Sequence, residues 1–536
     1  MNFNKYILFF VTILFLAHST SAQLWKEMIH DPGVNVYTVV QEAEEYFQNK
    51  DKKAKGSGWK TFQRWLFENE PKFYPSGDRS TVDPYFTSNS YKAFKKSNPP
   101  ASKALFNNGW EELGPHYIEQ VTGHYSAGLG RVESFYADPN DTLRIYVGSR
   151  SGGFWRTTDG GANWTSNTTD SLFATGVNTM SVSPTNHDSI LINVRNANNG
   201  ATHGIYRSVD AGDTWSVTNF NPTNLGWGGM GTNRSIYKIA YHPVVPDLVF
   251  IGTQEGLFRS SDDLATWTMP VATLDFRAIA FHPTDPDIIY AVTSNDDTHI
   301  YISLDGGITF NTSSTITGNT SDIKISVSAA CPNCVYIGSS DGVWKSTDEG
   351  QNFSLQSIPG LSNYGAFAVS DRDTNYILFG NIDVNMSTDE GQTFDQATIW
   401  SQGNANYNTT GTYVHADIRG SRCENGVFWV NTDGFLCKSK DNGVSWHIFE
   451  GQSIRENYNL GLSQSNHERT ISGSQDNGTS IKTENSWVEF YGADGMEGII
   501  HPLNDDWMIG SLQYGGRRRT KDGGITQQGV TPFGQN

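Results

Sequence analysis

The stretch FWRTTDGGANW, residues 154–164, decides the fold because close copies of it recur along the chain. Three of the copies are IYRSVDAGDTW at 205–215, IYISLDGGITF at 300–310 and LCKSKDNGVSW at 436–446. In such a turn the aspartate carboxylate can accept backbone N–H groups, the glycine can adopt a positive φ, and the final aromatic ring can enter a hydrophobic layer. The repeat therefore predicts that its aspartates serve folding rather than catalysis.

The spacing of the copies indicates the architecture. Most of them lie 41 to 52 residues apart, and the last interval of 81 residues leaves room for a weakened copy, IKTENSW, which ends at Trp487. A period of about 40–50 residues is typical of the four-stranded blades of a β-propeller. The repeat aspartates are Asp159, Asp210, Asp262, Asp305, Asp348, Asp389, Asp441 and Asp522.

Short strands with turns between them fill the intervals, as in ESFYADP at 133–139 and RIYVGS at 144–149. The chain is therefore predicted to be all-β, with a multi-bladed β-propeller of about nine blade units over residues 109–536. These units would form one large ring, or one seven-bladed ring plus part of a second. Because the sequence stops at TPFGQN, directly after a copy, we expect the propeller to be incomplete at its C-terminal end.

The N-terminal part of the chain differs from the rest. Residues 1–22 combine a lysine, an apolar run and a small-residue cleavage site, which predicts a cleaved signal peptide and a secreted or cell-surface protein. Residues 23–108 space apolar side chains at three and four, which predicts a short helical N-terminal arm that continues into an extended, proline-containing segment. No later stretch approaches the roughly 20 apolar residues of a transmembrane segment.

Charge and cysteine content narrow the function further. A net charge of -18 disfavours nucleic acid as a partner. Cys331 and Cys334 form the motif CPNC, which precedes a strand-like segment and is therefore predicted to be a local structural disulfide. Cys423 and Cys437 flank a hairpin-like segment and are candidates for a second disulfide.

The repeated turns match the Asp-box, or BNR, repeat, and the order of the motifs resembles that of secreted sortilin-like and xyloglucanase-like propellers of Bacteroidetes. In the resembling xyloglucanases, a segment of the type RTDVGG carries a catalytic aspartate; here the segment is GSRSGG and has Arg150 at that position. A guanidinium cannot act as a general base, so the resemblance implies the fold more than the reaction. Sialidase chemistry needs a cluster of arginines, but Arg131, Arg150 and Arg195 are scattered. The matching motifs are WEELGP at 110–115, GRVESFYADP at 130–139, VHADIRG at 414–420, NTDG at 431–434, GSQDNGT at 473–479 and GADGMEGIIHP at 492–502.

Five polar residues are predicted to converge on one rim of the channel. The blade scheme puts His415 and Asp417 on a first strand, Asp433 and Asp476 in loops between second and third strands, and Asp494 at the start of a first strand. Clustered carboxylates suit calcium or sugar hydroxyls, and two of them at the right separation could perform acid and base catalysis. Since DG and DNG also form turns well, and a single histidine is usually packed, a structural role is the competing interpretation.

Exposed aromatic rings are a second candidate contact surface. Trp227, Tyr407 and Tyr514 lie in loops rich in glycine or asparagine, where a ring can stack on a sugar or anchor a peptide. The sequence thus favours a secreted, monomeric, non-enzymatic module that binds a polysaccharide or a protein. The alternative is a glycoside hydrolase acting on β-glucans such as xyloglucan.

Overall fold

A computed structural model of the chain describes most of residues 24–530; the longest stretches outside the described residues are 81–89, 98–111 and 403–410. The predicted signal peptide also lies outside them, so export stays a prediction. The chain divides into two compact units, residues 1–110 and 111–536, which we describe separately. In the part that the structure describes, no helix is long and apolar enough to cross a membrane.

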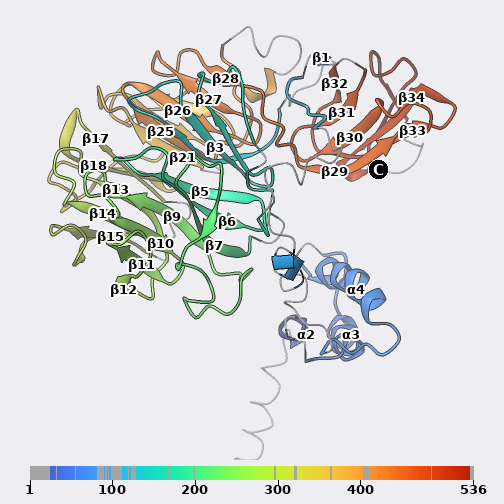
Figure 1. Ribbon diagram of the computed structural model, residues 1–536, viewed down its shortest axis with the longest axis horizontal. Coiled ribbons are helices and arrows are strands. Elements are labelled where there is room, and N and C mark those ends of the chain that lie inside the picture. Colours follow the sequence, from blue (N-terminus) through green and yellow to red (C-terminus); the bar gives the residue numbers. More distant parts are fainter. Residues whose placement is uncertain are drawn as a thin grey trace, which may run out of the picture. The chain divides into compact units, whose positions relative to one another are not determined.

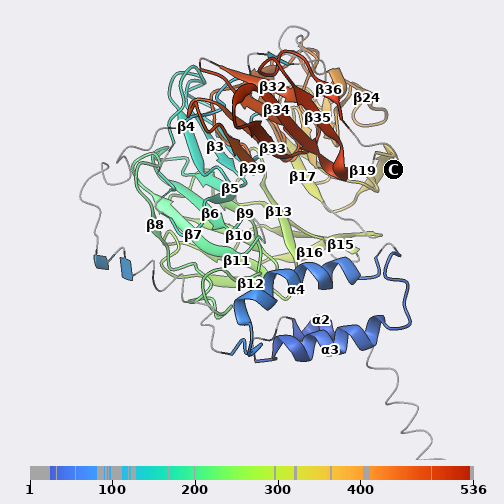
Figure 2. The same cartoon turned by 90° about the vertical axis from the view of Figure 1, so that its right-hand side faces the viewer.

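The first unit is a small helical arm (Figure 2). Its helices are α2 (Leu24–Met28), α3 (Val36–Phe47) and α4 (Trp59–Phe73). The Asn35 side chain caps α3 by accepting the Tyr37 N–H at 2.9 Å, which satisfies a donor that the helix leaves free. Buried rings of Trp25, Phe47 and Phe62 hold the helices together.

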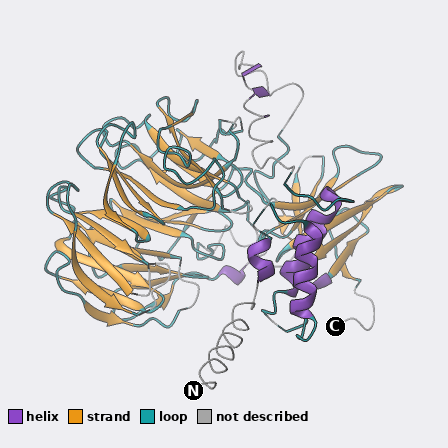
Figure 3. Ribbon diagram, turned by 90° about the horizontal axis from the view of Figure 1, so that it is seen from below, coloured by secondary structure: helices purple, strands orange, loops and turns teal. Residues whose placement is uncertain are grey.

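Strands dominate the second unit (Figure 3). Where the structure describes this unit, they form nine antiparallel meanders. We number them as blades 1–9 in chain order. The first four are blade 1 with β2 (Val132–Ala137), β3 (Ile145–Ser149) and β4 (Phe154–Thr157); blade 2 with β5 (Gly176–Val182), β6 (Ile190–Arg195), β7 (Thr202–Ser208) and β8 (Ser216–Val217); blade 3 with β9 (Ile236–Tyr241), β10 (Val249–Thr253), β11 (Gly256–Ser260) and β12 (Thr268–Ala272); and blade 4 with β13 (Phe276–Phe281), β14 (Ile289–Thr293), β15 (Asp297–Ser303) and β16 (Asn311–Thr317).

The remaining blades follow the same order (Figure 1). They are blade 5 with β17 (Lys324–Ser328), β18 (Cys331–Ser339), β19 (Gly342–Ser346) and β20 (Ser354–Ser357); blade 6 with β21 (Ala366–Val369), β22 (Ile377–Gly380), β23 (Val384–Ser387) and β24 (Asp395–Gln396); blade 7 with β25 (Gly420–Glu424), β26 (Val427–Asn431), β27 (Leu436–Ser439) and β28 (His447–Phe449); blade 8 with β29 (Asn457–Leu462), β30 (Thr470–Ser474), β31 (Thr479–Lys482) and β32 (Trp487–Tyr491); and blade 9 with β33 (Gly495–His501), β34 (Asn504–Leu512), β35 (Arg517–Thr520) and β36 (Gln528–Gly529).

Blades 1–7 close into one ring. Each neighbouring pair buries its own hydrophobic cluster, including a cluster between blades 7 and 1 that contains Val132 and Trp429. Backbone hydrogen bonds join the same two blades: Val132 N donates to Thr432 O at 3.0 Å, and Leu129 N donates to Gly434 O at 3.0 Å. Of the two predicted arrangements, the structure therefore has the seven-bladed ring with further blades outside it.

Blades 8 and 9 pack on each other through a separate cluster that includes Ile471, Phe490 and Ile500. A short strand from the start of the unit, β1 (Gln120–Val121), extends blade 8 by pairing in parallel with β32. Blade 8 also contacts the ring directly, because Arg455 donates to Gly128 O at 2.6 Å. The ring and the two further blades are thus one continuous unit.

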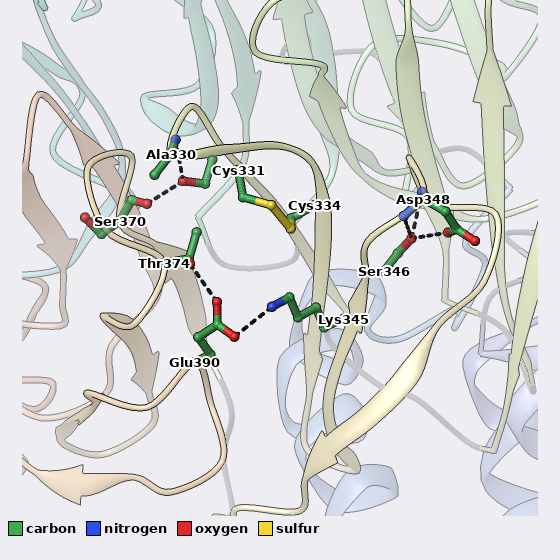
Figure 4. Close-up of a disulfide and its surroundings, with 11 residues drawn as sticks. Ala330, Cys331, Cys334, Lys345, Ser346, Asp348, Ser370, Thr374 and Glu390 are labelled. Atoms are coloured by element: carbon green, nitrogen blue, oxygen red, sulfur yellow. Dashed lines mark hydrogen bonds and ion pairs between the residues drawn. A yellow bond between two sulfur atoms is a disulfide. The ribbon is translucent and has the colours of Figure 1, made fainter.

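The repeated aspartates all make the same turn, as at Asp348 in Figure 4. The Ser346 hydroxyl donates to Asp348 Oδ1 at 2.7 Å, and the same carboxylate accepts the Asn352 N–H at 2.9 Å. Even at Asp262, where Leu264 replaces the glycine, Leu264 adopts φ 69° and the contacts persist. Corresponding serine or threonine contacts occur at Asp159, Asp210, Asp305, Asp389, Asp441 and Asp522.

Two of the four cysteines form a disulfide, and the other two are free thiols. Cys331 and Cys334 form a disulfide at the start of β18 (Figure 4). The predicted pairing of Cys423 with Cys437 is wrong, because both are free thiols. Cys423 lies on β25 and Cys437 on β27, with β26 between them. Strands two apart in a sheet are separated by roughly 10 Å, which exceeds the reach of a disulfide.

Candidate functional site

The structure brings the five predicted rim residues together. Asp433 lies between β26 and β27, Asp476 lies between β30 and β31, and Asp494 directly precedes β33, as predicted from the blade scheme. His415 and Asp417 are not on a first strand but in the loop that leads into β25. Together with Trp400 and Gln513 these residues line a pocket of about 170 Å³, which we call the acidic pocket.

Ion pairs fix the ring side of the acidic pocket. Arg419 follows Asp417 by two residues, and its guanidinium binds both oxygens of Asp433, with Nε to Oδ1 at 2.7 Å. It also lies 3.2 Å from Asp417 Oδ2. Burial alone would raise the pKa of Asp433, but the hydrogen bonds and charge of Arg419 outweigh it and lower that pKa. Asp433 is therefore a buried, ionised carboxylate.

Asp476 is in the opposite protonation state. Burial, followed by the negative charges of Asp433 and Asp494, raises the pKa of its carboxyl to about 7. The protonated carboxyl is within hydrogen-bonding reach of Asp433, so the ionised member of this pair can accept the proton of the other. A carboxylic acid that keeps its proton near neutral pH is the group that a general acid requires.

Backbone geometry holds Asp476 in place. Its φ is 55° and that of Asp417 is 63°, a left-handed conformation that a residue with a side chain adopts only when its surroundings impose it. Its N–H donates to Asp494 Oδ1 at 2.9 Å, and its carbonyl oxygen lies 3.1 Å from His415 Nε2. Burial lowers the pKa of His415, so this ring packs and positions the Asp476 loop.

Calcium fits this pocket poorly. One oxygen each from Asp417, Asp433 and Asp476 lie within 4.8 Å of one another, which resembles a cation site. Two of these three carboxylates already bind the Arg419 guanidinium, and the third retains a proton near neutral pH. Calcium prefers six to eight oxygen ligands, most of them charged or carbonyl. The donor set suits acid and base chemistry better than a metal.

Three arginines that are scattered in the sequence also meet beside the acidic pocket. Arg131 precedes β2, Arg150 follows β3, and Arg195 ends β6. Arg131 lies 2.8 Å from Glu133 and 3.5 Å from Asp433, and Arg195 lies 3.5 Å from the same Glu133. The three arginines are thus scattered in the sequence but not in the structure, because they lie on adjacent blades and the closure of the ring brings Arg131 to Asp433.

The predicted aromatic contacts are less well placed. Trp227 packs at the edge of the cluster between blades 2 and 3 and lines no part of the acidic pocket. Tyr514 is fully exposed and follows Gln513, which does line the pocket, while Tyr407 lies outside the described residues. The sequence interpretation missed Tyr458 on β29, which is 52% exposed. Burial and then the charges of Asp494 and Asp476 raise its pKa, which puts this ring beside the acids.

Comparisons with known proteins agree on the fold. No protein-family model matches the chain. A xyloglucanase of a Paenibacillus species is 26% identical over 213 residues, which is 34% of this chain and only 20% of that relative. The structure of the GH74 xyloglucanase from Xanthomonas campestris matches with a TM-score of 0.57 at 16% identity, over 77% of this chain and 69% of that one. An ancestral GH74 enzyme gives 0.55 at 16% identity, over 77% and 63%. The chain thus has a β-propeller fold similar to that of GH74 xyloglucanases.

These comparisons overturn one prediction. From Arg150 and the dispersed acids we expected a protein without enzymatic activity, but the sequence relative is named a xyloglucanase and both structures are named GH74 enzymes. The error came from giving Arg150, which removes only one possible general base, more weight than the predicted convergence of the acids, which share one pocket. The comparisons support the glycoside hydrolase alternative better than the binding module.

Proposed function

We propose that the chain is a glycoside hydrolase that cleaves a polysaccharide in the acidic pocket. The observation that carries the proposal is the Asp476 carboxyl, whose pKa of about 7 leaves it protonated under mildly acidic conditions. In this role Asp476 donates its proton to the glycosidic oxygen of the leaving group. The similarity to GH74 enzymes and to a xyloglucanase supports β-glucans such as xyloglucan as the first substrates to test.

A second carboxylate has to come from a residue other than Arg150. Asp433 is unsuitable because Arg419 occupies both of its oxygens and only 2% of its side chain is exposed. Asp417 is 38% exposed and has an oxygen within 4.8 Å of one on Asp476. Retaining glycosidases place their two carboxyl groups about 5–5.5 Å apart, whereas inverting ones need about 6.5–9.5 Å. Because their nearest oxygens lie within 4.8 Å, the two carboxyl groups are closer to the retaining separation than to the inverting one, and we assign Asp417 as the nucleophile of a retaining reaction.

Exposed rings can hold the sugar beside these carboxylates. Tyr458 is 52% exposed and near enough to Asp494 and Asp476 for their charges to raise its pKa, and Trp400 lines the pocket. Aromatic faces stack on the apolar face of a pyranose ring, which orients the glycosidic bond without adding charge. The pocket thus combines an acid, a nucleophile and a sugar platform.

The test is release of reducing ends from xyloglucan and other β-glucans by the full chain. Asp476→Asn and Asp417→Asn should each lower the rate at least 100-fold, in line with the roughly 10²–10⁴-fold contribution of a positioned acid or base. Asp395→Asn is the matched control, because Asp395 is exposed on β24 of blade 6 and does not line the acidic pocket. Unchanged rates in the Asp476 variant would contradict the proposal.

A further inference from the structure

A compact group of guanidinium ions flanks Asp476, and hydrolysis of a neutral sugar does not require it. We call Arg131, Arg150 and Arg195 the arginine cluster. Arg150 N donates to Arg131 O at 3.3 Å. Burial lowers the pKa of Arg195, Glu133 opposes this effect, and the charges of Arg150 and Arg131 add to it. The three side chains are 14%, 26% and 23% exposed, so they are held in place yet still reachable from solvent.

The arginine cluster has more donors than acceptors. Its carboxylate partners besides Asp433 are Glu133 and Glu456, with Arg150 Nε 3.5 Å from Glu456 Oε1. Asp433 adds little, since it is already bound to Arg419. Each guanidinium carries five N–H donors in a fixed planar fork. Among the described residues, the buried Nε groups of Arg131 and Arg195 make no hydrogen bond.

The cluster also lies directly beside the proposed acid. Arg131 Nε is 3.5 Å from Asp433 Oδ1, and Asp433 is the neighbour that shares a hydrogen bond with Asp476. On the other side, Gln475 N donates to Glu456 O at 3.0 Å, which joins the partner of Arg150 to the residue before Asp476. Asp433 and the contact between Gln475 and Glu456 thus connect the arginine cluster to the Asp476 loop from two sides.

We propose that the arginine cluster binds the carboxylate of an acidic sugar, so that the polysaccharide carries uronate or nonulosonate units. This statement rests on the proposed function for its substrate class, but the binding site itself does not. Planar guanidinium groups match the two oxygens of a carboxylate, and charge-assisted bonds of this kind are about twice as strong as neutral ones.

The experiment measures binding in the Asp476→Asn chain, which removes the proposed acid so that turnover does not obscure affinity. Two matched pairs of ligands are titrated calorimetrically: tetragalacturonate against cellotetraose, and 3′-sialyllactose against lactose. We expect the acidic member of at least one pair to bind tenfold or more tightly than its neutral partner. The pair that shows the preference identifies the carboxylate as that of a uronate or a nonulosonate. Arg150→Gln should remove at least tenfold of that preference, and raising the salt should weaken acidic ligands only.

Controls separate this inference from the hydrolase proposal. Arg372→Gln removes an exposed arginine that bonds Asn425 on blade 7, and it should leave the preference unchanged. Arg150→Lys keeps the charge without the planar fork and should lose part of the preference, and it replaces Arg150→Gln if that variant fails to fold. Equal binding of acidic and neutral ligands overturns the inference even if hydrolysis is found. A preference that survives Arg150→Gln also overturns it, because the anion then binds elsewhere.

Discussion

Replacing Asp476 by asparagine should raise the free energy of unfolding and abolish hydrolysis in the same protein. The carboxyl ionises at 3.8 in the unfolded chain and at about 7 in the folded one. Between these pH values the folded protein keeps a proton that the unfolded chain has lost. The stability of the protein therefore falls as the pH rises through this window, and the full penalty is present above pH 7. An asparagine cannot ionise, so it escapes the penalty, and its amide can still donate to Asp433.

The magnitude follows from the same pKa. At about 1.4 kcal/mol per pH unit, the difference between 3.8 and about 7 corresponds to about 4 kcal/mol. Because the side chain is only partly buried, solvent reduces this to about 2–4 kcal/mol at pH 8. At pH 4 the two proteins should have nearly equal stability. The rate of hydrolysis should nevertheless fall by about 10²–10⁴ at every pH, since the proton donor is gone.

The assay is urea unfolding at pH 4 and pH 8, followed by tryptophan fluorescence, together with reducing-end release at pH 6. Asp395→Asn, on the exposed strand β24, serves as the control and should change neither quantity. A stability difference that is the same at both pH values would refute the raised pKa of Asp476. A stabilised variant with full hydrolytic activity would leave the pKa intact and refute the catalytic role.

Four further outcomes are expected. The value of kcat/KM should fall above about pH 7, because only protonated Asp476 can donate a proton to the glycosidic oxygen. A profile that is flat to pH 9 would contradict this expectation. Proton NMR of the first product should show retention of the anomeric configuration, whereas inversion would exclude Asp417 as nucleophile. Ser387→Ala should destabilise blade 6 by about 1–3 kcal/mol, because the buried Gly391 N–H, which donates to Ser387 Oγ at 2.8 Å, loses its acceptor. Urea unfolding that matches the parent protein would refute this role of the hydroxyl. Thiol titration should find two reactive thiols in denaturant. In the folded protein both should react slowly, because burial raises the pKa of Cys423 to about 12 and also raises that of Cys437. No reactive thiol in denaturant would restore the predicted second disulfide.

The repeat period predicted the rim acids well because it carries positional information. Once each aspartate turn is aligned, the loop between second and third strands is located to within a residue or two, and Asp433 and Asp476 fall into it. The positions of the residues in the loop before β25 could not be predicted in this way. Residues 411–419 bring His415 and Asp417 to the pocket without forming a strand, so the pattern of alternating side chains does not apply there.

The arginine cluster and the ring size could not be predicted from local pattern. Arg131 meets Asp433 because the ring closes between blades 1 and 7, a contact across some 300 residues of chain. Nothing in the period of a blade states after how many copies the ring closes, since this depends on the angle between packed sheets. Arg419 could have been found, because it follows Asp417 by two residues in VHADIRG, where a cation beside clustered acids indicates a pairing role.

The parallel pairing of β1 with β32 has a consequence for biosynthesis. Gln120 pairs with Val488, so this strand must wait for about 370 further residues to be made before its partner exists. At a synthesis rate of about 5–20 residues per second, the delay is roughly 20–70 s. The seven ring blades can be completed during this time, but the loop that carries Asp476 is translated after all of them. The order of synthesis therefore allows the ring to be complete before the proposed acid has been made, and the strand that is synthesised first pairs with one of the strands that are synthesised last.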